Sequence, residues 1–229
     1  MKPLSSASRK ATFPSTIRRL IWLLSSRPIS YCVPSQAILA TMPTGTVNFE
    51  SGERMACSDR FTIKIHGQKA HGSAPNLGKD AILAAAAAIQ VLQTIPSRIN
   101  DPFNALVVSV GMFHGGTKEN IIADEAELVG TVRAFNREFR NGMPELIKKV
   151  VEPTVEGCTA EFDYYFGPSP LINDDEELVK TARRAAAEEM GEEALVPLKK
   201  MTGAEDFSVY TEHVPGVFGY LGCRNEEKG

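Results

Sequence analysis

Apolar and polar residues alternate along several short stretches of the chain, and this period of two predicts half-buried β-strands. The run FTIKI at 61–65 alternates strictly. The runs ALVVSVGMF at 105–113 and AEFDYYF at 160–166 are rich in β-branched and aromatic residues, which favours two more strands. A fourth strand is predicted within 121–135, after a double-glycine turn at 115–116.

Two other stretches have helical spacing. DAILAAAAAIQVL at 80–92 contains Ala and Leu but no Gly or Pro, so we predict a helix with Asp80 as its N-cap and Pro96 beyond its end. In 143–155 the apolar residues recur every three or four positions, and Pro153 should end or bend this second helix.

The resulting order, β-α-β-β-α-β, is the split βαβ or ferredoxin-like plan of an α+β domain, with two helices on one face of a four-stranded antiparallel sheet. After the prolines at 168–170 the chain changes to a charged helix at 174–190, a loop at 201–207 and a short apolar segment at 216–221. Because prolines flank it, 168–172 is predicted to be a domain boundary.

Composition narrows the class of protein. With 43% hydrophobic and 23% charged residues, the chain resembles a soluble globular protein. No apolar run reaches the roughly 18 residues that span a bilayer, so we expect no membrane partner. The four cysteines, Cys32, Cys57, Cys158 and Cys223, form no CxxC pair, which favours free thiols in a reducing, cytoplasmic compartment.

The charge of the first 36 residues differs from that of the rest. This segment has six basic residues and no acidic one, which leaves 19 basic against 28 acidic residues elsewhere. A transit peptide, a basic arm and a non-native start upstream of a folded domain are all compatible with this pattern. We expect residues 1–36 to be disordered or non-native, and we expect no nucleic-acid partner because the basic residues are not densely clustered.

Three longer motifs resemble one known family. They are MPTGTVNFESGERMACSDRFTIKIHGQKAHGSAPNLGKDAI, NIIADEAELVGTVRAFNREFR and MTGAEDFSVYTEHVPGVFGYLG, and in this order they cover most of 42–222. Together they resemble the aminoacylase, hippurate hydrolase, auxin-conjugate amidohydrolase and carboxypeptidase G family of metallopeptidases.

The resemblance implies a two-domain enzyme in which a ferredoxin-like lid domain interrupts a zinc-peptidase-like α/β catalytic domain. It implies a homodimer formed through the lid, two divalent metal ions (zinc, manganese or cobalt), and hydrolysis of the amide bond of small N-acyl amino acids or peptides. On this basis 37–59 is a remnant of the catalytic domain, 60–168 is the lid, and 169–229 is a partial C-terminal part of the catalytic domain.

The resemblance also assigns roles to individual residues. His71 matches the lid histidine that stabilises an oxyanion in the partner's active site, although alone it would be taken for a loop histidine that caps a turn. Asn120 and Arg133 match residues that hold the amide and the carboxylate of the substrate; otherwise they are a turn Asn and an exposed strand Arg. Glu205 and Asp206 are expected to line the cleft.

The other histidines receive structural interpretations. We expect His66 at a strand end, His114 in a turn and His213 on the surface. Glu205 and Asp206, as neighbours on an extended segment, should point in opposite directions and therefore not share a proton.

The metal ligands of the family are missing from the sequence. Residues 1–49 contain no His, Asp or Glu, and Ala37 stands where resembling sequences have a metal-binding histidine, eight residues before Gly45. We therefore expect no metal bound by this chain and no hydrolase activity of the chain alone, and expect it to be a fragment.

Two alternatives to an amidohydrolase chain remain at this stage. One is a non-catalytic dimerisation or interaction module, and the other is a small ferredoxin-like ligand-binding domain. The segments before 60 and after 170 should also lack packing partners, which would expose an apolar patch at 217–221 and leave these segments poorly ordered.

Overall fold

The computed structural model describes residues 33–155 and 157–224, so the basic segment expected at 1–36 lies outside the described residues except for its last four. The mixed α/β chain divides by its internal contacts into two compact units. Unit 1 contains, of the described residues, 33–52, 173–199 and 210–224, whereas unit 2 contains 53–172 and 200–209. Each unit is described by itself.

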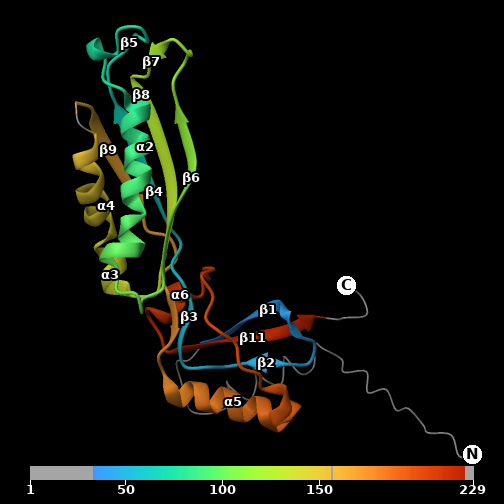
Figure 1. Cartoon of the computed structure of the whole chain (residues 1–229). Helices are drawn as coiled ribbons and strands as arrows, with labels where there is room; N and C mark the ends of the chain where they lie inside the picture. Colours follow the sequence, from blue (N-terminus) through green and yellow to red (C-terminus); the bar gives the residue numbers. More distant parts are fainter. Residues whose placement is uncertain (1–32, 156, 225–229) are drawn as a thin grey trace, which may run out of the picture. The chain divides into compact units, whose positions relative to one another are not determined.

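Figure 1 labels the α-helices and every strand except β10 along the chain. The elements are β1 (Val33–Pro43), β2 (Val47–Asn48), β3 (Gly52–Met55), β4 (Asp59–His66), β5 (Ala70–His71), η1 (Pro75–Leu77), α2 (Ala81–Leu92), η2 (Ile95–Ile99), β6 (Leu106–Gly115), β7 (Ile121–Ile122), β8 (Glu125–Ala134), α3 (Arg137–Asn141), α4 (Met143–Val151), η3 (Glu152–Thr154), β9 (Thr159–Tyr165), β10 (Leu171–Asn173), α5 (Glu176–Met190), η4 (Glu192–Ala194), α6 (Ser208–Thr211) and β11 (Gly216–Arg224).

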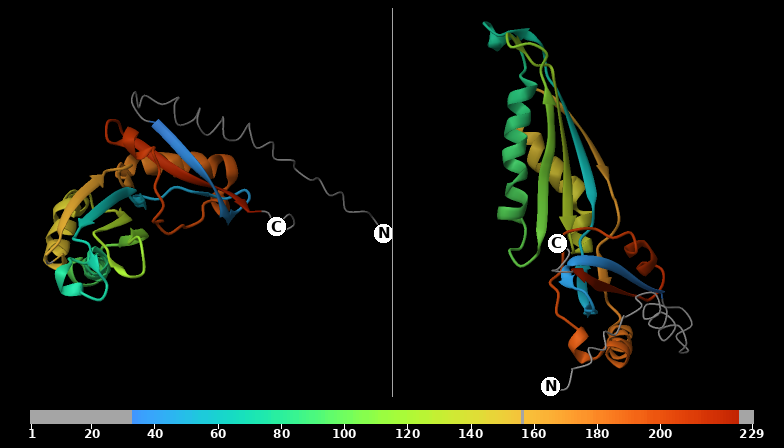
Figure 2. Two further views of the ribbon diagram at one scale, coloured as in Figure 1. Left: turned by 90° about the horizontal axis from the view of Figure 1, so that it is seen from above. Right: turned by 90° about the vertical axis from the view of Figure 1, so that its right-hand side faces the viewer.

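Unit 2 is built on a four-stranded sheet with the order β6-β8-β4-β9, in which every neighbouring pair is antiparallel. Along the chain the order is β4-α2-β6-β8-α4-β9, as the sequence predicted. Both views in Figure 2 place α2 and α4 on the same face of this sheet. One face of the sheet is therefore covered by helices, and β6 and β9 form its edges.

The core of unit 2 lies between the sheet and these helices. Phe61, Ile63 and Ile65 alternate on β4 and are buried, while the residues between them face away. On α2 the buried positions include Ala84, Ala85 and Ala88. Because alanine side chains are short, the helix axis can approach the sheet closely while the larger strand residues fill the space between them.

The predicted helix is confirmed at both ends, since α2 begins after its N-cap Asp80 and ends at Leu92. The Asp80 carboxylate accepts hydrogen bonds from the backbone N–H groups of Ile82 and Leu83, at 3.0 and 3.1 Å. Beyond Leu92, however, the chain continues into the irregular helical turn η2, which includes Pro96. A proline is tolerated there because it occupies the first turn of a new helical segment, where its missing N–H is not needed.

Unit 1 contains the sheet β1-β11-β2, and here one expectation is wrong. The segment 217–221 is not an exposed patch, since Val217 is 0% and Phe218 1% exposed. Strand β1 pairs in parallel with β11 along most of its length, and the apolar side of α5 contributes Leu178 and Val179 to the same core. The β1, α5 and β11 segments of unit 1 therefore pack against one another.

The helical stretch 81–99, which joins α2 and η2, has the length and mean hydropathy, 1.3, of a segment that could cross a membrane. The sequence predicted no apolar run of about 18 residues, because the apolar residues after Asp80 end near Leu92. A single such helix is weak evidence, since core helices of soluble proteins also meet these criteria.

Candidate functional site

His71 and Asn120 are neighbours at one end of unit 2, which we call the tip. Strands β5 and β7 pair there with His71 opposite Ile121, and the N–H of Gly72 donates to the carbonyl oxygen of Asn120 at 2.7 Å. A Cβ on Gly72 would lie 3.1 Å from that oxygen, so this close approach favours glycine. Both His71 and Asn120 are exposed.

Arg133 lies at the opposite end of unit 2, which we call the base. It stands near the end of β8, opposite Val107 of β6, and is half-buried. From Glu125, where β8 begins near the tip, to Arg133 the strand extends about 26 Å. Within one chain, therefore, Arg133 does not join His71 and Asn120 in a single site.

Glu205 and Asp206 also belong to the base. The loop that precedes them is fixed by a hydrogen bond from the N–H of Ala56 to the carbonyl oxygen of Gly203 at 2.8 Å, and the next residue, Cys57, donates its N–H to Ala134 at 2.9 Å. These bonds place the loop beside the end of β8 that carries Arg133.

The expectation that Glu205 and Asp206 lie on an extended segment is wrong, because the chain turns at Asp206. Burial, followed by interaction with the neighbouring Asp206 carboxyl group, raises the pKa of Glu205. The turn therefore removes the reason for expecting the two side chains to point in opposite directions.

The histidines other than His71 lie apart from Glu205 and Asp206. His66 is the last residue of β4, and its Nε2 is 3.3 Å from the Glu161 carboxylate. His114 is in β6, opposite Glu127, so its expected place in a turn is wrong: the strand extends two residues beyond the predicted end. His213 is exposed, as expected.

The metal centre implied by the family resemblance has no matching ligand set within residues 33–155 and 157–224. No group of three His, Cys, Asp or Glu side chains lies close enough there to hold a metal ion. Ala37, at the position expected for a histidine, pairs with Tyr220 in the β1–β11 ladder and offers only a methyl group. The described residues do not fit a dinuclear metal centre, and no reaction step is assigned to one here.

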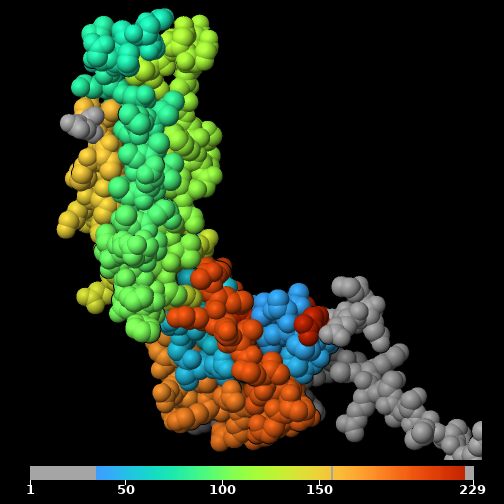
Figure 3. Space-filling model, viewed as in Figure 1, coloured from blue at the N-terminus to red at the C-terminus, as the bar shows by residue number. Residues whose placement is uncertain are grey.

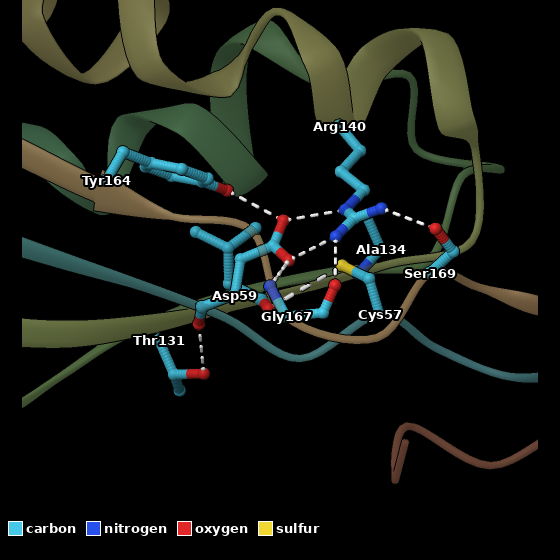
Figure 4. A network of polar contacts seen from close by, with 9 residues as sticks. Cys57, Asp59, Thr131, Ala134, Arg140, Tyr164, Gly167 and Ser169 are labelled. Atoms are coloured by element: carbon cyan, nitrogen blue, oxygen red, sulfur yellow. Dashed lines mark hydrogen bonds and ion pairs between the residues drawn. The ribbon is translucent and has the colours of Figure 1, made fainter. Parts of the chain in front are cut away.

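A buried polar network lies at the base of unit 2 (Figure 4). It was not predicted from the sequence. Arg140 of α3 donates from Nε and Nη2 to the two carboxylate oxygens of Asp59, at 2.8 and 2.7 Å. The same guanidinium donates to Ser169 Oγ at 2.9 Å and to the carbonyl oxygen of Gly167 at 2.7 Å. Tyr164 donates its hydroxyl to Asp59 at 2.9 Å.

The network closes the base by joining the segment that enters β4 to the segment that leaves β9. Burial alone would lower the pKa of Arg140, but the hydrogen bonds to Asp59 and the charge of Asp59 act together against burial, and the net effect raises the pKa. One sequence signal was available: Asp59 stands in phase with the buried residues Phe61 and Ile63. A carboxylate at a buried strand position requires a charged or hydrogen-bonding partner.

Cys57 lies beside this network and gives a pH-dependent prediction. Burial, and then the charge of Asp59, raise the pKa of its thiol from 9.0 to about 11. The folded state therefore holds this proton more tightly than the unfolded state, so the thiol's contribution to stability is lost as pH rises from about 9 to about 11.

Urea unfolding across this pH range should show a steeper loss of stability for the wild type than for Cys57→Ala. The matched control is Cys223→Ala, which changes an exposed cysteine and should follow the wild-type curve. Parallel wild-type and Cys57→Ala curves would contradict the raised pKa.

A family model for the peptidase dimerisation domain of M20 proteins matches residues 56–156, which includes most of unit 2. The chain belongs to the M20 family of amidohydrolases and peptidases.

Among M20 relatives, the N-acetylcysteine deacetylase of Bacillus subtilis is 36% identical over 188 residues, 82% of this chain and 49% of the relative. A crystal structure of a protein described as an aminohydrolase from methicillin-resistant Staphylococcus aureus has a TM-score of 0.77 at 29% identity, over 86% of this chain and 51% of that one. A Bacillus subtilis M20 peptidase described as binding a dinuclear metal has a TM-score of 0.67 at 31% identity, over 84% and 48%. The chain spans about half the length of the curated relatives it matches.

Proposed function

We propose that unit 2 is the dimerising lid of an M20 amidohydrolase that acts on N-acyl amino acids, and that it supplies His71 and Asn120 to the active site of a second subunit. The relative that hydrolyses N-acetylcysteine supports this substrate class. The split βαβ order of unit 2 supports the assignment as a ferredoxin-like lid.

The separation of the two groups of site residues carries the proposal. His71 and Asn120 are at the tip, whereas Arg133, Glu205 and Asp206 are at the base. A substrate no larger than an acylated amino acid cannot bridge a strand about 26 Å long. Two copies related by a two-fold axis, with their sheets side by side in opposite directions, would bring the tip of one copy to the base of the other.

The surface expected to form this dimer is the β6 edge together with the outer side of α2. As an edge strand, β6 has one side without a neighbouring strand in the sheet, and it exposes Met112 and Phe113. The helix has no charged residue, and Ile82 and Leu83 are 38% and 69% exposed. Figure 3 shows α2 running along the open surface of unit 2. An uncharged helix face with large exposed apolar residues is typical of an interface.

Each residue of the composite site has a chemical task in amide hydrolysis. When water adds to the amide carbonyl, negative charge develops on its oxygen, and an N–H of His71 can stabilise that charge by a hydrogen bond. The planar guanidinium of Arg133 suits the carboxylate of an amino acid, and the side chain of Asn120 suits its amide. Glu205 and Asp206 would line the cleft at the base.

We expect the polypeptide alone to show no turnover, because its described residues lack a set of metal ligands and the relative described above binds a dinuclear metal. In this case the chain would act as a dimerisation module within the family. The free thiols of Cys57, Cys158 and Cys223 are consistent with a reducing compartment such as the cytoplasm.

The first test combines light scattering, metal analysis and hydrolysis of N-acetyl amino acids on one purified sample. We expect a molar mass of twice 24.9 kDa, with no hydrolysis in the presence of zinc, manganese or cobalt. A monomer would contradict the supply of His71 to a second subunit. Hydrolysis with stoichiometric bound metal would contradict the expected inactivity.

Leu83→Glu should dissociate this dimer. In a two-fold interface both copies carry the change, and each loses about 1.5–3 kcal/mol of apolar burial, which weakens the dimer by about 10²–10⁴-fold. Light scattering against concentration measures this. The matched control is Ile38→Glu, an exposed apolar residue of unit 1 with 65% exposure, which should leave the mass unchanged. If both variants stay dimeric, the interface lies elsewhere.

A further inference from the structure

Two hydrogen bonds converge on one ring nitrogen of His71. The hydroxyl of Ser73 is 2.7 Å from Nδ1, and the backbone N–H of Ser73 donates to the same Nδ1 at 3.2 Å. A backbone N–H can only donate, so Nδ1 must accept and carries no proton in this arrangement. The hydroxyl, which can rotate, then donates to Nδ1 as well.

The turn that holds these donors is fixed on both sides. The N–H of Ala74 donates to the carbonyl oxygen of His71 at 2.8 Å, and Gly72 donates to Asn120 at 2.7 Å. Pro75 then begins η1 and restricts the backbone that follows. The N–H of Ser73 is therefore directed at the imidazole by the backbone itself, before any substrate is present.

We infer that Ser73 is a positioning residue that holds neutral His71 in the tautomer with its proton on Nε2. When Nδ1 accepts two hydrogen bonds, the proton of the neutral ring resides on Nε2. Within the described part of the chain Nε2 has no hydrogen-bond partner, and the side chain is exposed, so this N–H is available outside its own subunit.

The positioning role of Ser73 rests on the proposed function, because it affects catalysis only if His71 acts in an active site. Stabilisation of an oxyanion requires a donor, and the Nε2–H tautomer presents one. In the opposite tautomer Nε2 would present a lone pair to the developing negative charge, and the interaction would be repulsive. Ser73 thus acts through His71 and need not touch the substrate.

Long-range ¹H–¹⁵N NMR of the histidine rings in the full chain tests the inference without an activity assay. The chain has only four histidines, so the spectrum can be assigned with His71→Gln. At a pH where the ring is neutral, we expect wild-type His71 to show the Nε2–H pattern. Ser73→Ala removes one donor and should raise the Nδ1–H population about fivefold, the effect of one net hydrogen bond.

Ser73→Thr keeps a hydroxyl and should restore the wild-type pattern, which a purely structural role for the side chain would not require. His213 serves as the internal reference in every spectrum. The amide exchange of Gly72 shows whether the β5–β7 pairing survives each change. A wild-type spectrum dominated by Nδ1–H, or a Ser73→Ala spectrum identical to wild type with the pairing intact, would overturn the inference.

The two proposals can fail separately. A monomeric chain with the expected tautomer would contradict the supply of His71 to a second subunit and leave the role of Ser73 intact. A dimer with the Nδ1–H tautomer would contradict only the role of Ser73.

Discussion

Arg140→Met should lower the free energy of unfolding of unit 2 by about 3–5 kcal/mol, the range observed when one partner of a buried ion pair is removed. The Asp59 carboxylate would remain buried with only the hydroxyl of Tyr164 and the N–H of Gly167 as donors. Neither compensates for the lost positive charge. Urea unfolding followed by circular dichroism measures the change.

The matched control is Lys180→Met, which breaks an exposed ion pair whose Nζ–Oε1 distance to Glu177 is also 2.7 Å. Water and salt screen exposed ion pairs, so this variant should unfold close to the wild type. The double variant Asp59→Leu with Arg140→Met should recover part of the loss, because no charge stays unpaired. Equal losses from Arg140→Met and Lys180→Met would show that the buried network does not stabilise the base.

Phe218→Ala should lower the stability of unit 1 by about 3–5 kcal/mol, the cost of replacing a buried phenylalanine by alanine. Phe218 is 1% exposed in β11 and packs edge-to-face on Tyr220, with ring centroids 5.2 Å apart. Its backbone N–H also donates to the side chain of Asn173. Hydrogen exchange of the β11 amides, measured by mass spectrometry, should accelerate by about 10²–10⁴-fold.

Ile38→Ala is the control for this change, since Ile38 is 65% exposed on the neighbouring strand β1. Its exchange in β11 should stay within about threefold of wild type. If the β11 amides of the wild type already exchange as fast as an unfolded chain, unit 1 has no stable core in solution. That result would restore the sequence-based expectation of poorly packed flanking segments.

Local patterns were sufficient for the elements of unit 2. The alternation at 61–65 predicted the buried face of β4, and the Ala- and Leu-rich run without Gly or Pro after Asp80 predicted α2 together with its cap. Such signals act over a few residues, because strand alternation and helical spacing depend on the chain's own geometry. The helical turn η2 that follows α2 was not predicted, since a proline in a new helical turn has the same local sequence as a proline that ends a helix.

The sequence predicted only part of the candidate site. The motifs around His71, Asn120 and Arg133 suggested family roles for them, but did not predict that Arg133 lies at the other end of β8. For Glu205 and Asp206, the sequence suggested an extended segment, whereas the structure has a turn at Asp206. The network of Arg140 was not predicted at all, because its partners are up to 81 residues apart in the chain.

The sequence by itself determined the family, the β-α-β-β-α-β order and the residues that match the chemistry of the M20 proteins. Only the tertiary structure decided which of these residues lie together, which carboxylate is paired, and which apolar strands are covered. The reason is physical. Periodicity and capping are local properties of the backbone, whereas burial and ion pairing depend on segments that meet only after folding, as β1 meets β11 and Asp59 meets Arg140.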